Sequence, residues 1–300
     1  MYKQSLASQG PGKISVVINA QNVEADLPRA LASVKSLADE IVVVDQGLTD
    51  KTLDIAKRAG AKVFSHKGVD YVEKARNFGL SKATKDWILV LDPDEEIPQG
   101  LAREIQKILK DPKADYYRIP RKNIIFGHWM KYARWWPDYN IRLFKKGAVS
   151  WNEIIHAVPM TQGKGGEIES KEELSIIHYN YSGIDDYLEK MIRYSKIQSE
   201  DLIKSKYKFD WKDLINKPVN EFLSRYFAGQ GYKDGLHGLV LSLLQAFSEF
   251  VVYVRVWGKD GYPEKEIGKS EVEGVFDKNI HDIEWWIRKE FSWLHFPKFW

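Results

Sequence analysis

The sequence predicts an α/β protein with a doubly wound, mainly parallel sheet, followed by a helical carboxyl-terminal region. Two observations predict it. Short apolar runs alternate with helical patterns from residue 13 to about residue 114, and such repetition of strand and helix builds a parallel sheet. One of these runs, residues 87–91, has no polar alternation, which is typical of a strand covered on both faces. Helices are therefore expected on both sides of the sheet.

The individual elements follow from local patterns. Strands are expected where apolar residues run together, and helices where apolar residues recur every three or four positions. Gly60 is suited to end the second helix, and Pro98 to open the fourth helix in its first turn. The expected strands are 14–18, 41–44, 61–64 and 87–91, and the expected helices are 25–37, 49–59, 71–83 and 98–109.

The pattern changes twice after the repeated strands and helices. Residues 115–159 read as short strands rich in aromatic residues with Arg and Lys between them, so we expect this segment to line an acceptor site. From Ser182 onward the chain reads as helical, with later helices expected at 220–227, 235–256 and 282–291. The domains are accordingly placed at 13–180 for the sheet, with an acceptor-side segment at 115–160, and at 181–300 for the helices.

The start of the helical region carries two specific signals. Ser182 and Asp185 are spaced like a capping box, in which a hydroxyl and an acid satisfy the first free N–H groups of a helix. Tyr187, Met191 and Tyr194 recur at helical spacing, which predicts a stripe packed into the core.

Composition excludes several kinds of protein. The 300 residues contain no cysteine, which excludes disulfides, thiolate metal sites and thiol nucleophiles and fits a cytoplasmic protein. The net charge is only +3, with basic and acidic residues interspersed, so nucleic acid is not an expected partner. Residues 1–13 have neither a long apolar stretch nor a cleavage-site pattern, so secretion is not expected. Residues 236–257 are apolar but interrupted by His237, Gln245, Glu249 and Arg255, so we expect a buried or interfacial helix there and no transmembrane segment.

The segment most informative about function is Asp92-Pro93-Asp94, which directly follows the apolar run 87–91. Ligands of open α/β sheets bind at the carboxyl ends of the strands, and two carboxylates one residue apart suit a hard divalent cation that also needs phosphate oxygens. The alternative is a solvated turn that leads into a helix, with Glu95 and Glu96 near its positive end.

Three strand ends converge if the sheet forms as predicted. They carry the loop at residues 19–22, Asp45, and the acidic turn at residues 92–94. A nucleotide lying across them would find backbone groups at the first, a carboxylate for base or ribose at the second, and a metal at the third. Asp45 also has an ordinary interpretation, because Asp before Gln46-Gly47 is common turn chemistry.

Together these residues resemble the inverting family 2 glycosyltransferases of GT-A fold, in particular the lipopolysaccharide-core glucosyltransferases. The resemblance covers residues 13 to 195, with a weaker echo at 234–239. It rests on the segments 14–18 (ISVVI), 38–45 (ADEIVVVD), 76–77 (RN), 87–95 (WILVLDPDE), 136–138 (WPD), 141–144 (IRLF) and 177–179 (IHY), and on His156.

The resemblance implies a GT-A-like fold and transfer of a hexose, with inversion, from a nucleoside-diphosphate sugar to a hydroxyl of a glycan or glycolipid. A UDP-sugar is the expected donor, and Mg²⁺ or Mn²⁺ is the expected cofactor, because a divalent cation neutralises the charge that develops on the departing diphosphate. The implied nucleotide-binding residues are Ala20, Gln21, Asp45, Arg76 and Asp92, and the implied metal ligands are Asp92, Asp94 and His156.

Two of these assignments have ordinary alternatives, and two loops depart from the family. Arg76 could be an exposed helix residue, and His156 could be structural. His178 follows two isoleucines, so we expect it to be a packed core residue outside the site. The family pattern Lys-Asn-Glu is Gln-Asn-Val at 21–23, and Asp-Ser-Gly-Ser-Thr-Asp is Asp-Gln-Gly-Leu-Thr-Asp at 45–50, which puts the nucleotide and the sugar in doubt.

An inverting transfer needs a base that takes the proton of the attacking hydroxyl. Asp138 is the candidate, because Trp135 and Trp136 precede it and could stack on sugar rings while desolvation raises the basicity of the carboxylate. The alternative is that Pro137-Asp138 is a surface turn. Glu153 is the reserve candidate for the base.

The last sixteen residues, 285–300, combine tryptophans with basic residues. This mixture suits peripheral contact with a membrane interface, at the inner face of the membrane, where a lipid-linked acceptor would be presented. The segment could equally cap the hydrophobic core or form a subunit contact.

The sequence leaves two rival functions open. One is nucleotidyl transfer to a sugar phosphate, although the glycine-rich basic loop that would bind a triphosphate is lacking at residues 19–26. The other is a degenerate transferase that serves as a non-catalytic glycan-binding scaffold, which the altered first loop makes credible.

Overall fold

The computed structural model describes residues 12–66, 72–151 and 159–291. The chain divides into two compact units, and each is described by itself. The sheet unit comprises the residues up to Asn123 together with Pro137–Asn180, and the helical unit comprises Ile124–Trp136 together with the residues from Tyr181. The segment 124–136, which the sequence placed on the acceptor side of the sheet domain, thus groups with the helices.

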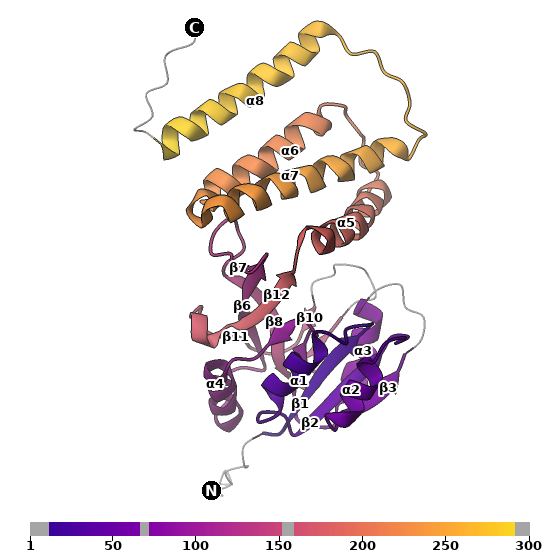
Figure 1. Cartoon of the computed structure of the whole chain (residues 1–300), viewed down its shortest axis with the longest axis vertical. Helices are drawn as coiled ribbons and strands as arrows, with labels where there is room; N and C mark the ends of the chain where they lie inside the picture. Colours follow the sequence, from indigo (N-terminus) through magenta and orange to yellow (C-terminus); the bar gives the residue numbers. More distant parts are fainter. Residues whose placement is uncertain (1–11, 67–71, 152–158, 292–300) are drawn as a thin grey trace, which may run out of the picture. The chain divides into compact units, whose positions relative to one another are not determined.

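Four parallel strands form one half of the sheet (Figure 1). Its strands lie in the order β3-β2-β1-β4, and all of them run in parallel. Val17 of β1 pairs with Val42 on one side and with Val90 on the other. The parallel sheet predicted from alternating strands and helices is therefore confirmed. The strands are β1 (Ile14–Ala20), β2 (Glu40–Asp45), β3 (Lys62–Ser65) and β4 (Trp87–Leu91).

Helices cover both faces of this half, so the doubly wound arrangement is also confirmed. One apolar cluster joins Leu31, Ala56 and Ile105 of three helices to Val16 and Leu89 of the strands. The helix α3 packs on the opposite face, where a Cβ added to Gly79 would lie 2.8 Å from Val17 and 2.9 Å from Val44. The helices are α1 (Leu27–Val34), α2 (Thr52–Arg58), α3 (Val72–Lys82) and α4 (Gln99–Lys110).

Several helix ends differ from the sequence prediction. The helix α1 is shorter than expected at both ends, and α2 begins at Thr52 rather than at residue 49. Pro98 is not inside the first turn of α4, because it stands before the helix in an extended conformation. Helix ends are set by local capping contacts and are the least predictable part of an element.

The other half of the sheet is antiparallel and completes the order β3-β2-β1-β4-β8-β6-β12-β5. The strand β8 pairs antiparallel with β4, with Ile88 opposite Phe144, and β6 pairs antiparallel with β8. The strands are β5 (Glu95–Glu96), β6 (Tyr116–Ile125), β8 (Asp138–Lys145) and β12 (Ile176–Tyr181), and the shorter elements are β7 (His128–Trp129), β9 (Val149–Ser150), β10 (Met160–Thr161), β11 (Gly165–Glu167) and the 3-10 turn Glu172–Leu174. The strands expected after residue 114 are present, although β6 is long.

The helical unit contains four long helices and a short hairpin, in which Ile124 pairs with Trp129. The helices α6 and α7 lie side by side (Figure 1), Gln245 of α7 donates to the Tyr187 hydroxyl of α5 at 2.9 Å, and Asn279 of α8 donates to Asn216 of α6 at 2.8 Å. The elements are α5 (Ile184–Lys204), α6 (Asp213–Leu223), a π turn (Ser224–Ala228), a 3-10 turn (Gly231–Asp234), α7 (Gly235–Gly258) and α8 (Lys269–Glu290).

Three details of the expected helical unit are wrong. The capping acid at the start of α5 is Asp186 rather than Asp185, because the Ser182 backbone N–H donates to Asp186 at 3.0 Å. In the predicted core stripe Tyr187 and Met191 are buried, whereas Tyr194 is 39% exposed. The helices α6 and α8 also begin earlier than expected, at Asp213 and Lys269.

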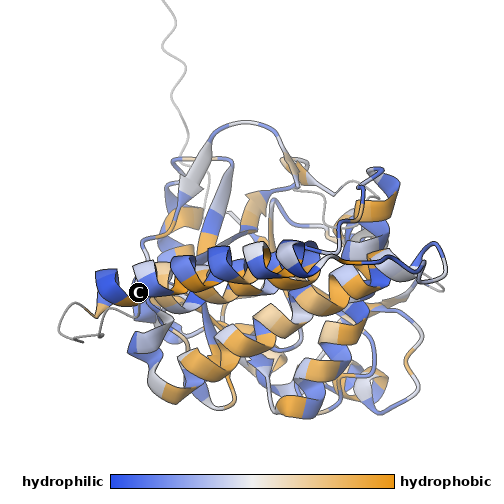
Figure 2. Cartoon of the chain, turned by 90° about the horizontal axis from the view of Figure 1, so that it is seen from above, coloured by the Kyte–Doolittle hydropathy of each residue, from blue (hydrophilic) through white to orange (hydrophobic). Residues whose placement is uncertain are grey.

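The helix α7 has an apolar exposed side. Leu241, Val252 and Val256 are buried, whereas Leu236 is 72% exposed and Phe247 48% exposed. Figure 2 shows apolar residues along much of this helix. By length and composition, Gly231–Gly258 is the one described helix that could cross a membrane, with a mean hydropathy of 1.6 and 33% of the best window buried.

Candidate functional site

The acidic turn lies at the carboxyl end of β4, where the sequence predicted it. All five residues of β4 are buried, and the chain turns immediately after Leu91. The turn is closed at both ends, because the Glu95 N–H donates to the Asp92 carbonyl at 3.0 Å and the Asp92 N–H donates to the Glu95 carboxylate at 2.9 Å. Asp92 and Asp94 therefore project from a fixed loop at the rim of the sheet.

Two arginines lie against the carboxylate of Asp92. Arg142 of β8, which is only 4% exposed, donates to Asp92 Oδ2 at 2.5 Å, and Arg76 of α3 lies 3.7 Å from Asp92 Oδ1. Burial raises the pKa of Asp92, but the charges of Arg142 and Arg76 outweigh it and hold the pKa well below its usual range. Arg76 is thus not the exposed helix residue of the alternative interpretation. Both oxygens of Asp92 therefore face guanidinium groups, and its roles as a nucleotide contact and as a metal ligand stay predictions.

Glu95 is a buried residue of the site that the sequence analysis missed. Its side chain is 0% exposed, and Arg142 donates to it at 2.6 Å while Arg121 of β6 approaches at 3.4 Å. Burial and the adjacent Asp92 charge raise the pKa of Glu95 despite these arginines. The alternative interpretation, a solvated acid near a helix start, is therefore wrong for Glu95, which contacts Arg121 of β6 and Arg142 of β8.

Asp138 begins β8 and faces the same cluster of charges. Arg121 donates to Asp138 Oδ2 through Nε at 2.9 Å and through Nη2 at 2.6 Å, and Asn140 donates to Oδ1 at 3.0 Å. Burial raises the pKa of Asp138, but Arg121 and the amides of Asn123 and Asn140 outweigh it, so the pKa is lowered. The expectation that desolvation makes this acid more basic is wrong. The carboxylate stays ionised instead, and its Oδ1 atom accepts fewer hydrogen bonds than Oδ2.

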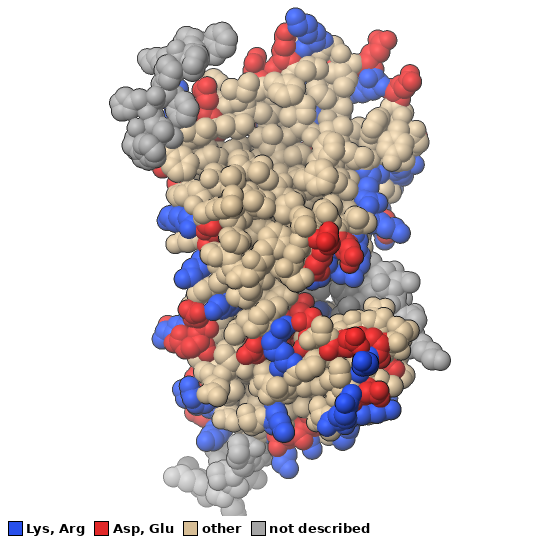
Figure 3. All heavy atoms as spheres, in the orientation of Figure 1, with Lys and Arg blue, Asp and Glu red and all other residues tan. Residues whose placement is uncertain are grey.

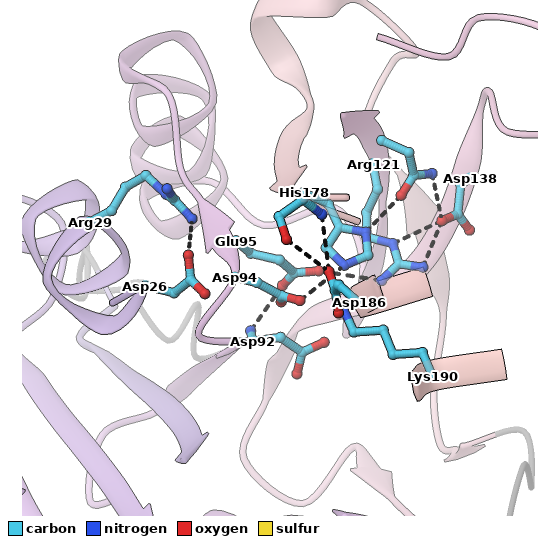
Figure 4. A network of polar contacts seen from close by, with 12 residues as sticks. Asp26, Arg29, Asp92, Asp94, Glu95, Arg121, Asp138, His178, Asp186 and Lys190 are labelled. Carbon is cyan, nitrogen blue, oxygen red and sulfur yellow. Dashed lines mark hydrogen bonds and ion pairs between the residues drawn. The ribbon is translucent and has the colours of Figure 1, made fainter. Parts of the chain in front are cut away.

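His178 of β12 lies between the two ends of the site, as Figure 4 shows. Its Nδ1 atom is 2.6 Å from Asn123 Oδ1, and its Nε2 atom is 3.5 Å from Asp94 Oδ2. Asn123 in turn donates to Asp138 at 3.2 Å. The prediction that His178 is a core residue outside the site is therefore half wrong, because the ring is buried but contacts the acids. Because His178 lies two residues after Ile176 on the same strand, the sequence pattern indicated a core position only.

Comparisons with known proteins agree with this geometry. Residues 15–161 match the family described as glycosyl transferase family 2. An uncharacterized glycosyltransferase of Rickettsia typhi is 34% identical over 248 residues, which cover 80% of this chain and 85% of that protein. The chain belongs to the family 2 glycosyltransferases.

Two further matches are more distant. A lipopolysaccharide core biosynthesis glycosyltransferase of Rhizobium meliloti, LpsC, is 23% identical over 251 residues, covering 81% of this chain and 92% of that protein. A crystal structure of residues 1–349 of TarS from S. aureus superposes with a TM-score of 0.43 at 14% identity, over 86% of this chain and 94% of that chain. As a member of this family the protein is a transferase enzyme.

The donor side predicted for this family 2 glycosyltransferase includes the ends of β1 and β2. Asp45 Oδ1 accepts from the N–H groups of Gly47 and Leu48 at 2.8 and 2.9 Å, and Oδ2 accepts from Ser65 at 2.9 Å, so turn chemistry accounts for part of its role. Ala20 is buried and Gln21 is exposed. Asn19 of β1 is 7% exposed, and neither polar atom of its side chain has a hydrogen-bond partner within the described residues. The nucleotide contacts of Ala20, Gln21, Asp45, Arg76 and Asp92 stay predictions.

Part of the predicted metal site lies outside the described residues. His156, an expected ligand, and Glu153, the reserve base, lie outside the described residues. Within the described ranges no group of three or more acidic or histidine side chains could hold a metal ion. Asp94 fits a cation that takes its remaining ligands from water and diphosphate, because its side chain is 29% exposed and paired with no arginine or lysine among the described residues.

Proposed function

We propose that this glycosyltransferase moves a hexose, with inversion, from a nucleoside-diphosphate sugar to a hydroxyl of a glycan or glycolipid, assisted by Mg²⁺ or Mn²⁺. A UDP-sugar is the proposed donor. The observation that supports this proposal is the polar network in which Asp94 and Asp138 lie at opposite ends of His178 and Asn123. One end suits the leaving group and the other end suits the attacking hydroxyl.

On the donor side, we propose that the arginines complement the negative charge of the diphosphate. A diphosphate that accumulates negative charge as it departs is stabilised by fixed cations that need no rearrangement. The Arg76 side chain is 22% exposed and held against Asp92, so it is ordered before a nucleotide arrives. A divalent cation, when bound at Asp94, supplies further neutralisation of the diphosphate.

On the acceptor side, Asp138 is the proposed base. Because its pKa is lowered, the carboxylate is ready to accept a proton at neutral pH, although it is a weaker base than a desolvated acid would be. Its Oδ1 atom accepts the proton of the acceptor hydroxyl as the new glycosidic bond forms and the bond to the diphosphate breaks. Arg121, bound to Oδ2, keeps the carboxylate oriented.

We propose a lipid-linked acceptor at the cytoplasmic face of a membrane. LpsC is named for lipopolysaccharide core biosynthesis, which gives the glycolipid class support. The helical unit adds a physical argument, because Trp285 is 55% exposed at the end of α8 and Lys289 lies 4.7 Å from its ring centroid. Residues 292–300 of the aromatic and basic segment lie outside the described residues.

A panel of nucleotide sugars, assayed for release of nucleoside diphosphate with and without Mn²⁺, tests this function. The expected result is metal-stimulated hydrolysis of one donor, lost in Asp94→Asn and retained in Asp54→Asn, an exposed acid of α2. Turnover that is equal in Asp94→Asn and wild type would refute the role of the acidic turn. Calorimetry with UDP and Mn²⁺ separates an enzyme from a non-catalytic scaffold, which would bind neither.

A further inference from the structure

Asn19 is a polar residue buried near the end of a central strand. Its side chain lies on the face of β1 that α3 covers, because a Cβ added to Gly79 of α3 would meet Asn19 Oδ1 at 3.6 Å. The residue is 7% exposed, and within the described ranges neither Oδ1 nor Nδ2 has a hydrogen-bond partner. A buried amide without partners destabilises a folded protein, so its presence in the sheet needs an explanation.

Across the sheet, the neighbour of Asn19 is Asp92. Val17 of β1 pairs with Val90 of β4, and both belong to the apolar cluster on the α3 side of the sheet. Side chains alternate between the two faces of a strand. Two residues further along each chain, Asn19 and Asp92 therefore leave the sheet side by side and face α3 together.

Arg76 reaches the same place from α3. It precedes Gly79 by three residues, a spacing that puts two residues on one side of a helix. Its Nη2 atom lies 3.7 Å from Asp92 Oδ1, which is longer than a hydrogen bond, and its Nε atom is buried with no partner in the described part of the chain. The helix thus brings an unpaired donor to the side of the sheet where Asn19 has an unpaired acceptor.

We propose that Asn19 is a positioning residue of the donor site, whose amide accepts a hydrogen bond from Arg76 Nε when a nucleotide is bound. The inference rests on the proposed function. An ionised carboxylate can only accept, so the Nδ2 group of Asn19 faces Asp92 and leaves Oδ1 to face Arg76. A bound nucleotide fills the exposed side of Arg76, which is 22% exposed, and moves the guanidinium group towards the sheet.

The free and the nucleotide-bound protein should therefore respond in opposite directions to loss of the amide. In the free protein the unpaired amide is destabilising, so an apolar side chain of similar volume should stabilise the fold. In the bound protein the same substitution removes the hydrogen bond that orients Arg76, so nucleotide affinity should fall. A residue with a merely structural role would not produce opposite signs.

Asn19→Leu tests the proposal on the full chain. Thermal melting without ligand measures stability, and calorimetry with UDP, GDP and CDP in the presence of Mn²⁺ measures affinity. We expect the midpoint of unfolding to rise by about 2–4 °C and the affinity for the preferred nucleotide to fall about tenfold. Asn19→Ala, which cannot overfill the site, provides the same affinity comparison if leucine does not fit.

A second buried asparagine provides a matched control. Asn279 of α8 is 3% exposed, and its Nδ2 atom donates to Asn216 at 2.8 Å and to the Val275 carbonyl at 2.7 Å. Because this amide is paired, Asn279→Leu should lower the midpoint of unfolding and leave nucleotide affinity unchanged.

A double-mutant cycle tests whether the amide acts through Arg76. Arg76→Met should weaken nucleotide binding by itself, and adding Asn19→Leu to it should lower the affinity by less than about twofold. A further loss of about tenfold in that background would show that Asn19 acts without Arg76 and would overturn the inference. Wild-type affinity in both Asn19 variants would overturn it as well, while leaving the proposed function intact. If the wild type binds none of the three nucleotides, the proposed function is wrong too.

Discussion

The sheet unit and the helical unit of this glycosyltransferase differ in where they place their charged and apolar side chains. In the sheet unit Glu95 and Arg142 are buried and paired, next to the strand ends that face the candidate site. In the helical unit, by contrast, many large hydrophobic side chains are exposed. Among the described residues, Met160 is the exposed large hydrophobic side chain of the sheet unit, and all the others belong to the helical unit. On the face seen in Figure 3, uncharged surface extends over the helices.

This difference is consistent with the two kinds of partner proposed above. Burying an ionic network costs desolvation free energy. Such a network is useful where fixed charges must orient a charged ligand such as a diphosphate. Exposed apolar side chains in contiguous stretches mark contact with a lipid or protein surface. Leu243, Phe247 and Phe250 lie at helical spacing along one side of α7 and are each at least 38% exposed. The predictions below test this division of roles.

The largest expected effect is on chemistry in the sheet unit. Asp138→Asn removes the proposed base but keeps its shape and should lower kcat by about 10²- to 10⁴-fold. In wild type the acid limb of the pH profile should lie below the ordinary range of a carboxylate, because the pKa of Asp138 is lowered. Steady-state kinetics from about pH 3 to about pH 8, a range that includes the ordinary pKa of a carboxylate, measure both kcat and the acid limb. An unchanged kcat would exclude Asp138 as the base.

A large loss of stability is expected from Arg142→Met. The change leaves Asp92 and Glu95 in a buried site without their shared cation, which should cost about 3–5 kcal/mol. The matched control is Arg103→Met, at an exposed position of α4, with a change within about 0.5 kcal/mol. Urea unfolding compares the two, and a loss below about 1 kcal/mol would show that the network is weakly coupled to folding.

Glu40 provides a pH-dependent test away from the site. It is 6% exposed and accepts hydrogen bonds from Ser15 at 2.5 Å, from the Thr84 N–H at 2.7 Å and from Lys62 at 2.8 Å. Burial raises its pKa, but the bonds from Lys62, Ser15 and Thr84 outweigh it and lower the pKa to about 2.

A folded-state pKa below the unfolded value stabilises the protein above the unfolded pKa. Since the ordinary value is 4.5, this contribution, about 3 kcal/mol, should disappear as the pH falls from about 5 towards 2. The difference in unfolding free energy between wild type and Glu40→Gln should therefore shrink over that range. A difference independent of pH would contradict the assignment.

The smallest effect is expected at the apolar surface of the helical unit. Phe247→Ser should reduce binding to anionic lipid vesicles by about tenfold, because a buried aromatic side chain contributes about 1.5–3 kcal/mol. Met160→Ser, an exposed apolar position of the sheet unit, should leave vesicle binding unchanged. Cosedimentation measures both variants. Equal binding would show that the apolar side of α7 does not contact the bilayer.

The sequence by itself determined the parallel strands, the two-sided helix cover and the position of the acidic turn. These features follow from local patterns, because an apolar run and the residues that end it lie within one segment. The turn after Leu91 is an example, since Asp92 and Asp94 stand where the strand must leave the sheet.

Only the tertiary structure decided how the charges of the site are paired. Arg142 meets Asp92 across 50 residues of chain, Arg121 meets Asp138 across 17, and His178 meets Asn123 across 55. These contacts depend on the order and register of β4, β8, β6 and β12, which local patterns do not specify. The sequence could suggest that Asp138 was an acid near aromatic residues, but its lowered pKa depends on an arginine that a neighbouring strand supplies.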